Sequence, residues 1–239
     1  MSNDRYARYA AASGIIATVL IVGAFLGLVL PNAPDTDASA TAWASYYVDH
    51  GSRLQVGVVV AGVGLFFFAW FLGSIRSALA TAEGGQARLT SVAFGGGILG
   101  IATLLVALTS GAAAAFRPTD VDPTITRALN DIGVVAGGPG AAGFTAFFAA
   151  IAIVGYRYNA VPAPIAGFSA LAAITQPLAF GVAVTDSGVF AADGVLGGFV
   201  PILTFVIAMV TLSVALVRRP EGYATGPAGA SPQYVSTSS

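Results

Sequence analysis

Six long apolar runs constrain this chain more than any other feature of its sequence. Each run exceeds the roughly 18 residues that mark a helix able to cross the hydrocarbon core of a bilayer. Because the bilayer interior offers no water to unpaired backbone groups, such a run predicts a transmembrane α-helix. The runs cover residues 12–30, 54–75, 89–116, 132–156, 161–184 and 195–217. The sequence therefore predicts an all-α fold, a polytopic transmembrane bundle of six helices within a single domain, 1–219.

Charged residues are too scarce for a water-soluble fold of this length. They make up 9% of the 239 residues, and hydrophobic residues make up 56%, whereas a soluble domain carries about 25% charged residues. In a bilayer, apolar side chains face lipid instead of water, which removes the conflict. Residues 220–239 are different, because they are rich in Gly, Pro, Ser and Thr. We expect this segment to be a disordered cytoplasmic tail.

Three residue types are missing or nearly so, and their absence excludes several functions. The chain has no cysteine, which excludes disulfides, thiolate metal sites and cysteine nucleophiles. All ten basic residues are arginine, so a lysine Schiff base and a Walker-type phosphate loop are excluded as well. The one histidine, His50, does not by itself make a bis-histidine haem site. We therefore expect no enzymatic activity, no catalytic residue, no metal, no cofactor and no nucleic-acid partner.

The arginines are distributed unequally between the two sides of the predicted bundle. If the N-terminus is cytoplasmic, seven of the ten arginines fall in cytoplasmic segments, and eight of the eleven acidic residues fall on the outer side. An excess of arginine marks the cytoplasmic side of a membrane protein. The cytoplasmic set is Arg5, Arg8, Arg76, Arg88, Arg157, Arg218 and Arg219, and the outer set is Arg53, Arg117 and Arg127. The sequence predicts a multi-pass protein of the cell inner (plasma) membrane with both termini in the cytoplasm.

The N-terminal run has a second interpretation as a cleaved signal peptide. Arg5 and Arg8 precede the run, and the small residues Ala38-Ser39-Ala40 follow it, as a signal peptide requires. The run is longer than a usual signal core, and the small residues lie well beyond its end. These two departures favour a retained first span, and cleavage would leave five.

Two outer segments carry signals for helix starts. The segment 41–48 contains Trp43, Tyr46 and Tyr47, whose amphipathic rings favour the headgroup level. It predicts a short extracytoplasmic interfacial helix between spans one and two, beginning at Ser39 or Thr41. Farther along, Asp122 precedes Pro123, a pair suited to the cap and the first position of a helix. Span four is therefore expected to begin before the bilayer.

Glycines inside the spans indicate close helix packing. Gly96 and Gly100 have the small-xxx-small spacing that lets two helix backbones approach each other. We favour packing within the bundle over homo-oligomerisation through the glycine-rich spans. In span four the run Gly137-Gly138-Pro139-Gly140 weakens the helix. A simple kink is favoured there over a broken helix that exposes backbone groups to a ligand.

Four polar residues near or within spans four and five are candidates for ligand binding or transport. Gln176 precedes Pro177 in mid-membrane; it either bonds two helices together, which is favoured, or lines a cavity. Arg127 and Asp131 are four residues apart and therefore share a helix face, where they can pair, with Asn130 beside them. If Asp131 lay below the headgroups, its carboxylate would suit coupled transport.

The fifth candidate is His50, in the segment Asp49-His50-Gly51-Ser52-Arg53 at the outer start of span two. An imidazole beside a carboxylate can shuttle protons or sense external pH. An exposed interfacial position is the more common role at such a junction. A Ser-His-Asp triad from Ser52, His50 and Asp49 is excluded, because sequence neighbours do not converge as a triad requires.

Three stretches resemble a known kind of protein: His50 to Leu54, Phe66 to Arg76, and Ala93 to Gly97. They resemble an uncharacterised family of small bacterial six-helix integral membrane proteins, known as domains of unknown function from GC-rich genomes. The resemblance extends over roughly spans one to five. It implies a membrane location and supplies no activity and no functional residues.

These observations leave three functional hypotheses. The leading one is a non-enzymatic membrane protein that binds a lipid, another apolar ligand or a protein partner, because ionisable residues are scarce in its spans. The alternative is a small secondary transporter or channel that uses Asp131 and Gln176. A membrane-embedded enzyme is the third, and the missing cysteine and lysine argue against it. A cavity inside the bundle would support the first hypothesis.

Overall fold

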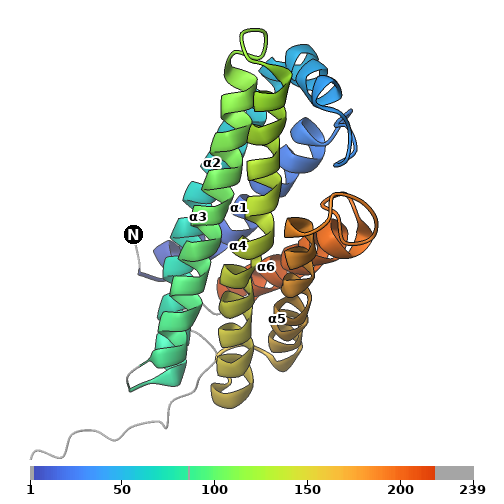
Figure 1. The fold of residues 1–239 in the computed structure, drawn as a ribbon. Helices are drawn as coiled ribbons and strands as arrows, with labels where there is room; N and C mark the ends of the chain where they lie inside the picture. Colours follow the sequence, from blue (N-terminus) through green and yellow to red (C-terminus); the bar gives the residue numbers. More distant parts are fainter. Residues whose placement is uncertain (1–2, 86, 219–239) are drawn as a thin grey trace, which may run out of the picture.

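A computed structural model describes residues 3–85 and 87–218. The described chain is an all-α bundle, with no strand in these two ranges, and it contains six helices long and apolar enough to cross a membrane (Figure 1). The elements are α1 (Asn3–Ala24), η1 (Phe25–Val29), α2 (Ala40–Glu83), α3 (Arg88–Phe116), α4 (Pro123–Tyr158), α5 (Ala163–Thr175), η2 (Gln176–Ala183), η3 (Val195–Phe199) and α6 (Val200–Arg218). The predicted six-helix fold is confirmed. The segment 220–239, predicted to be a disordered tail, lies outside the described residues.

Both predicted helix starts are present. The side chain of Ser39 accepts a hydrogen bond from the Ala42 backbone N–H at 3.2 Å, and α2 begins at the next residue. The side chain of Asp122 accepts from the Thr124 N–H at 2.8 Å, with Pro123 at the first position of α4. One detail of the prediction is corrected: the interfacial segment 41–48 is not a separate helix. It forms the first turns of the 44-residue α2; no proline separates it from the span, and the single glycine between them, Gly51, is held inside the helix.

The bundle has two different ends. At one end lie the start of α1, the α2–α3 and α4–α5 connections and the end of α6; this is called the arginine end, because six of the described arginines lie toward it. At the other end, called the loop end, lie the connections 30–39, 117–122 and 184–194. In Figure 1 the tips of α3 and α4 extend beyond the 184–194 loop. The long helices α2, α3 and α4 therefore provide most of the scaffold.

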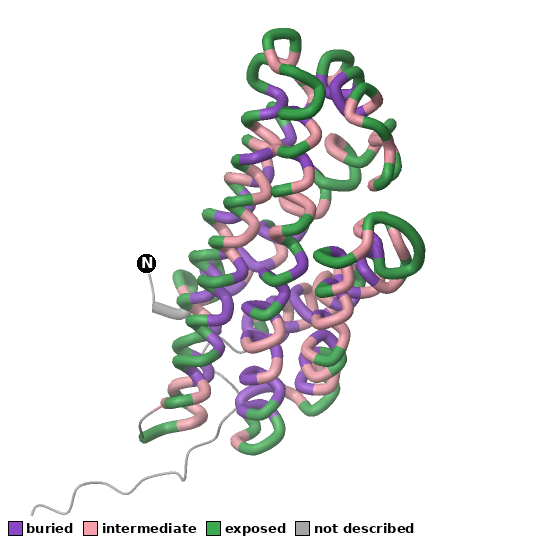
Figure 2. The backbone as a smooth tube through the Cα atoms, viewed as in Figure 1, coloured by how far each residue is buried: buried purple, intermediate pink, exposed green. Residues whose placement is uncertain are grey.

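The core is densest in the half of the bundle toward the arginine end (Figure 2). Phe68 and Phe71 of α2 and Phe147 and Phe148 of α4 are all fully buried. The Phe68 and Phe147 rings meet edge to face with centroids 6.1 Å apart, an arrangement that aromatic pairs favour. This aromatic group joins α2 to α4.

Glycines bring α3 and α4 into backbone contact. A Cβ on Gly143 would lie 2.7 Å from the Gly100 nitrogen and 2.8 Å from the Gly96 oxygen. We call Gly96, Gly100 and Gly143 the α3–α4 seam. The predicted small-xxx-small spacing is thus used within the bundle, and homo-oligomerisation through the glycines stays a prediction.

Prolines affect spans four and five differently. The helix α4 continues through Pro139, so a broken span four is wrong; the neighbouring turns of a long, packed helix hold the backbone in place. In span five the α-helix ends at Thr175, and the 3₁₀ segment η2 begins at Gln176-Pro177. Two further departures from α geometry are the π-helical segments η1 and η3.

An apolar cavity as candidate functional site

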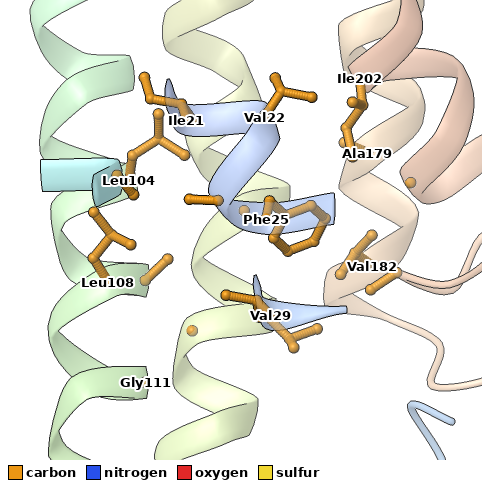
Figure 3. A pocket seen from close by; sticks show the side chains of 18 of the residues that line it. Ile21, Val22, Phe25, Val29, Leu104, Leu108, Gly111, Ala179, Val182 and Ile202 are labelled. Atoms are coloured by element: carbon orange, nitrogen blue, oxygen red, sulfur yellow. The ribbon is translucent and has the colours of Figure 1, made fainter. Parts of the chain in front are cut away.

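A cavity of about 400 Å³ lies in the half of the bundle toward the loop end. The elements α1 and η1 lie on one side of it, and η2, η3 and α6 lie on the opposite side (Figure 3). Residues of α2, α3 and α4 complete the wall. Its walls are mostly aliphatic and aromatic, with side chains such as Ile21, Leu108, Val182 and Ile202. Phe144 and Phe205, whose ring centroids are 5.0 Å apart, lie at its deep end. The volume falls within the roughly 300–1,000 Å³ of small-molecule sites.

Small residues keep this space open. A Cβ built on Gly111 of α3 or on Gly137 of α4 would meet no atom within 4 Å. A larger side chain at either position would project into unoccupied space instead of into a neighbouring helix. The wall contains four further glycines, at which a built Cβ would lie within 3.4 Å of a neighbouring residue: Gly57, Gly133, Gly197 and Gly198.

Every departure from α-helical geometry in the described chain lines the cavity. The π-helical η1 contributes Phe25 and Val29, the 3₁₀ segment η2 contributes Ala179 and Val182, and η3 contributes two glycines. Segments of 3₁₀ and π geometry make poorer hydrogen bonds than an α-helix and occur often at functional sites. At membrane depth, irregular backbone persists where protein buries it or where it lines a cavity. The irregular helices and the cavity therefore belong to one feature.

A polar pair marks the loop end of the cavity. The Tyr47 hydroxyl donates to Asn130 Oδ1 at 3.2 Å, and both residues line the cavity. Among the wall residues of α2, Tyr47 lies nearest the loop end, and among those of α4, Asn130 does. Asn130 is 9% exposed, and its buried Nδ2 has no hydrogen-bond partner in the described part of the chain. Leaving such a donor unsatisfied costs about 1–3 kcal/mol, so the polar pair contains one buried amide donor that the described chain leaves unpaired.

Gln176 lies deeper in the cavity, and its amide is already engaged. Its side chain is 4% exposed, and Nε2 donates to the Pro201 carbonyl of α6 at 2.9 Å. Beside it, the hydroxyls of Thr175 and Thr204 lie 2.7 Å apart. The two interpretations of Gln176 both describe the structure, because the residue bonds η2 to α6 and also lines the cavity.

Arg127 and Asp131 form the predicted pair, and they lie outside the cavity wall. Arg127 Nε is 2.8 Å from Asp131 Oδ1, and the Asp131 side chain is 45% exposed. The other Arg127 nitrogens donate to backbone carbonyls of the 30–39 connection, at Thr36 (2.8 Å) and Ala38. Asp131 therefore does not place a carboxylate in the cavity, and Arg127 holds a loop in position.

His50 is also away from the cavity. Its imidazole packs edge to face on the Tyr46 ring, with centroids 5.3 Å apart. Within residues 3–85 and 87–218, no group of three His, Asp or Glu side chains is arranged to hold a metal ion. His50 thus belongs to the aromatic surface of α2.

Sequence reasoning missed most of the cavity wall. The sequence predicts that Tyr47 lies at the headgroup level, whereas its hydrogen bond reaches a residue 83 positions away, which no local pattern signals. The glycine content of the spans was the available signal. It indicates close packing, whereas two glycines of the wall, Gly111 and Gly137, face unfilled space.

Comparison with known proteins adds nothing to these observations: no family model, no curated protein and no solved structure matches the chain. The similarity to the bacterial membrane-protein family stays a prediction. Function is therefore inferred from the cavity and its polar pair, because function resides in sites and not in folds.

Proposed function

We propose that this chain is an integral membrane protein that binds an apolar ligand carrying an oxygen acceptor, without catalysing a reaction. The observation that carries this proposal is the apolar cavity of about 400 Å³ with the unpartnered Nδ2 of Asn130 at one end. Ligand sites of this kind combine an apolar wall with a few polar groups that fix orientation.

The wall and the polar pair contribute different parts of the binding free energy. Removing apolar ligand surface from water contributes about 25 cal/mol per Å², although a ligand taken from lipid gains less, since lipid is itself apolar. A hydrogen bond to Asn130 contributes about 1 kcal/mol and removes the penalty of its unsatisfied donor. The polar pair therefore supplies selectivity among apolar molecules that fit.

A small secondary transporter or channel is the alternative function. Coupled transport usually places an ionisable side chain on the path through the membrane. Among the described residues, no Asp, Glu, Arg or His lines the cavity. Asp131 lies outside the cavity wall, paired with Arg127, and its side chain is partly exposed. No observation favours transport over binding.

We further propose that the protein lies in the plasma membrane with both termini in the cytoplasm. Support comes from the arginines, which gather toward one end of the bundle as the positive-inside rule requires. Because the chain has no cysteine, single thiols report orientation directly. Ser187 in the loop end and Ala163 at the arginine end are both exposed. A membrane-impermeant maleimide should label Ser187→Cys on intact cells and Ala163→Cys only after lysis, and the reverse pattern would overturn the orientation.

Native mass spectrometry in mild detergent tests the binding proposal, with a matched pair of variants on α3. Gly111 lines the cavity and Gly95 does not, yet a Cβ at either position meets no atom within 4 Å. Gly111→Phe should fill the cavity, while Gly95→Phe adds the same ring to an exposed face of the same helix.

We expect wild type and Gly95→Phe to carry the same stoichiometric bound mass, and Gly111→Phe to lose it. The mass also identifies the ligand class and gives the oligomeric state. A wild-type protein without any adduct, or an adduct that Gly111→Phe retains in full, would contradict the proposal.

A further inference from the structure

We infer that the ligand is an acyl-chain lipid taken sideways from the bilayer, with its oxygen-bearing head on Tyr47 and Asn130 and its chain directed toward Phe144. This inference rests on the proposed function and specifies its ligand. The chemistry it requires is a chain joined to ester, carboxyl or phosphate oxygens, which a phospholipid and a free fatty acid both have.

The cavity is long, and the Tyr47–Asn130 pair lies at one end of it, which matches an amphiphile with one polar end. Along α4 its wall runs from Asn130 to Phe144, which is roughly 21 Å at 1.5 Å per residue. Along α2 it runs from Tyr47 to Leu65, roughly 27 Å on the same basis. The unused donor lies at the loop end of this length, and the two phenylalanines lie at the other. A long molecule with acceptors at one end matches both features.

At the loop end, the connection 30–39 follows the wall residue Val29 and is fixed in place by hydrogen bonds. Arg53 Nη2 donates to the Pro31 carbonyl at 2.5 Å, and Arg127 donates to the carbonyls of Thr36 and Ala38. The Thr36 N–H donates to Asp193 Oδ2 at 3.1 Å. This last bond joins the connection that follows Val29 to the 184–194 loop, and both Val29 and Ala192 of that loop are wall residues. These hydrogen bonds hold the connection 30–39 and the 184–194 loop together beside the cavity.

The side of the cavity toward the lipid is less closed. The segment η1 packs on α1 and α2, and its backbone makes no close contact with η2 or η3, which face it across the cavity. Phe25 of η1 lines the cavity and is also 39% exposed. In Figure 3 its ring lies between the α1–η1 ribbon and the η2 side. An acyl chain dissolved in the bilayer can pass this point without breaking the hydrogen bonds that hold the connection 30–39.

The two tryptophans of the chain make the inference testable by fluorescence. Trp70 is 46% exposed, whereas Trp43 is 7% exposed, and its ring centroid is 6.3 Å from that of Tyr47 at the polar end of the cavity. Trp70→Phe therefore leaves one buried reporter next to the expected head position. Bromine quenches only tryptophans close to it, so lipids brominated on the chain carbons nearest the head report occupancy.

The experiment places Trp70→Phe protein in vesicles of plain phospholipid, of brominated phospholipid, or of plain phospholipid with brominated free fatty acid. Loss of Trp43 emission in either brominated arm is expected, and the arm that quenches names the source of the chain. Adding Gly111→Phe should restore the emission, adding Gly95→Phe should not, and aqueous iodide should leave it unchanged.

Unchanged Trp43 emission in both brominated arms would overturn the inference, and so would quenching that Gly111→Phe does not relieve. Strong quenching by iodide would also overturn it, because it would show access from water. The proposed function is judged separately. A bound mass of a different chemical class, lost in Gly111→Phe, would keep the binding proposal while the lipid inference fails.

Discussion

The α3–α4 seam and the cavity are both built with glycine, and they differ in what faces each glycine. At the seam, Gly143 faces the backbone of Gly96 and Gly100, so a missing side chain becomes a helix–helix contact. At the cavity, Gly111 and Gly137 face no atom within 4 Å, so a missing side chain becomes free volume. The same residue type therefore closes one half of the bundle and opens the other.

The difference follows from the backbone around each region. The seam lies between two regular α-helices, whose straight surfaces stay in contact over several turns. The cavity is bordered by η1, η2 and η3, where the helices change type and no longer follow their neighbours. Gly111 and Gly137 therefore have no partner helix on the cavity side, whereas Gly197 and Gly198 of η3 lie against backbone oxygens of the 184–194 loop.

The largest expected effect is at the seam. In Gly143→Leu, the new Cβ would lie within 2.8 Å of backbone atoms that cannot rotate away, so α3 and α4 must separate. We expect a loss of about 3 kcal/mol or more, at the upper end for overpacked cores, measured by unfolding in detergent. Gly95→Leu on the exposed face of α3 is the control. Equal stability of the two variants would show that the seam is not a tight contact.

Arg127→Gln should loosen the connection 30–39 at the loop end. The arginine donates to Asp131, Thr36 and Ala38, and bonds of a charged donor are worth about 1.5–3 kcal/mol each. We expect local opening of residues 30–39 to become easier by about 2 kcal/mol, seen as faster amide hydrogen exchange there. Arg117→Gln, an exposed position at the same end, should leave the exchange unchanged. Equal exchange in both variants would mean that Arg127 does not hold the connection.

Asn130→Leu separates binding from folding. The variant removes the unused donor and leaves the volume of the side chain nearly the same, so ligand affinity should fall about tenfold, which corresponds to one hydrogen bond of about 1.4 kcal/mol. The free energy of unfolding without ligand should change by less than about 1 kcal/mol, because the loss of the Tyr47 bond is offset by removal of an unsatisfied donor. Affinity that matches wild type in a titration of delipidated protein would exclude Asn130 from ligand contact.

Ser39→Ala should give the smallest effect. It removes the cap on α2, whose oxygen accepts from the Ala42 N–H, and such a loss costs about 1 kcal/mol. Because the cap lies in the first turn of a 44-residue helix, the change should appear as faster exchange of the first α2 amides, with little shift in the global unfolding temperature. A large global destabilisation would indicate that the start of α2 holds the bundle together.

The sequence was sufficient for features that depend on local spacing. The six spans follow from run length, the caps at Ser39 and Asp122 from residue type, and the Arg127–Asp131 pair from the i, i+4 rule. The start of the 3₁₀ segment at Gln176-Pro177 also has a local cause, because proline lacks the backbone donor.

The candidate site depends on distances that sequence spacing does not encode. Tyr47 meets Asn130 across 83 positions, and the cavity arises where α1–η1 stands apart from η2 and η3. Gly194 directly precedes η3 and Gly27 lies inside η1, but glycines occur throughout the spans, so they do not single out the π-helical segments. The sequence makes Asn130 a candidate only because it lies beside Asp131. Its buried, unpaired donor and its position in the cavity wall become visible only in the packed structure.

Thermal unfolding of delipidated protein, with and without added lipid, tests the central claim that the cavity is a binding site. A ligand that binds only the folded state at 100 times its Kd adds about 2.7 kcal/mol of stability. We predict that added lipid raises the unfolding temperature of wild type and Gly95→Phe, and leaves that of Gly111→Phe unchanged because its cavity is already filled. An equal rise in all three proteins would show that lipid acts on the outer surface, and would contradict the account.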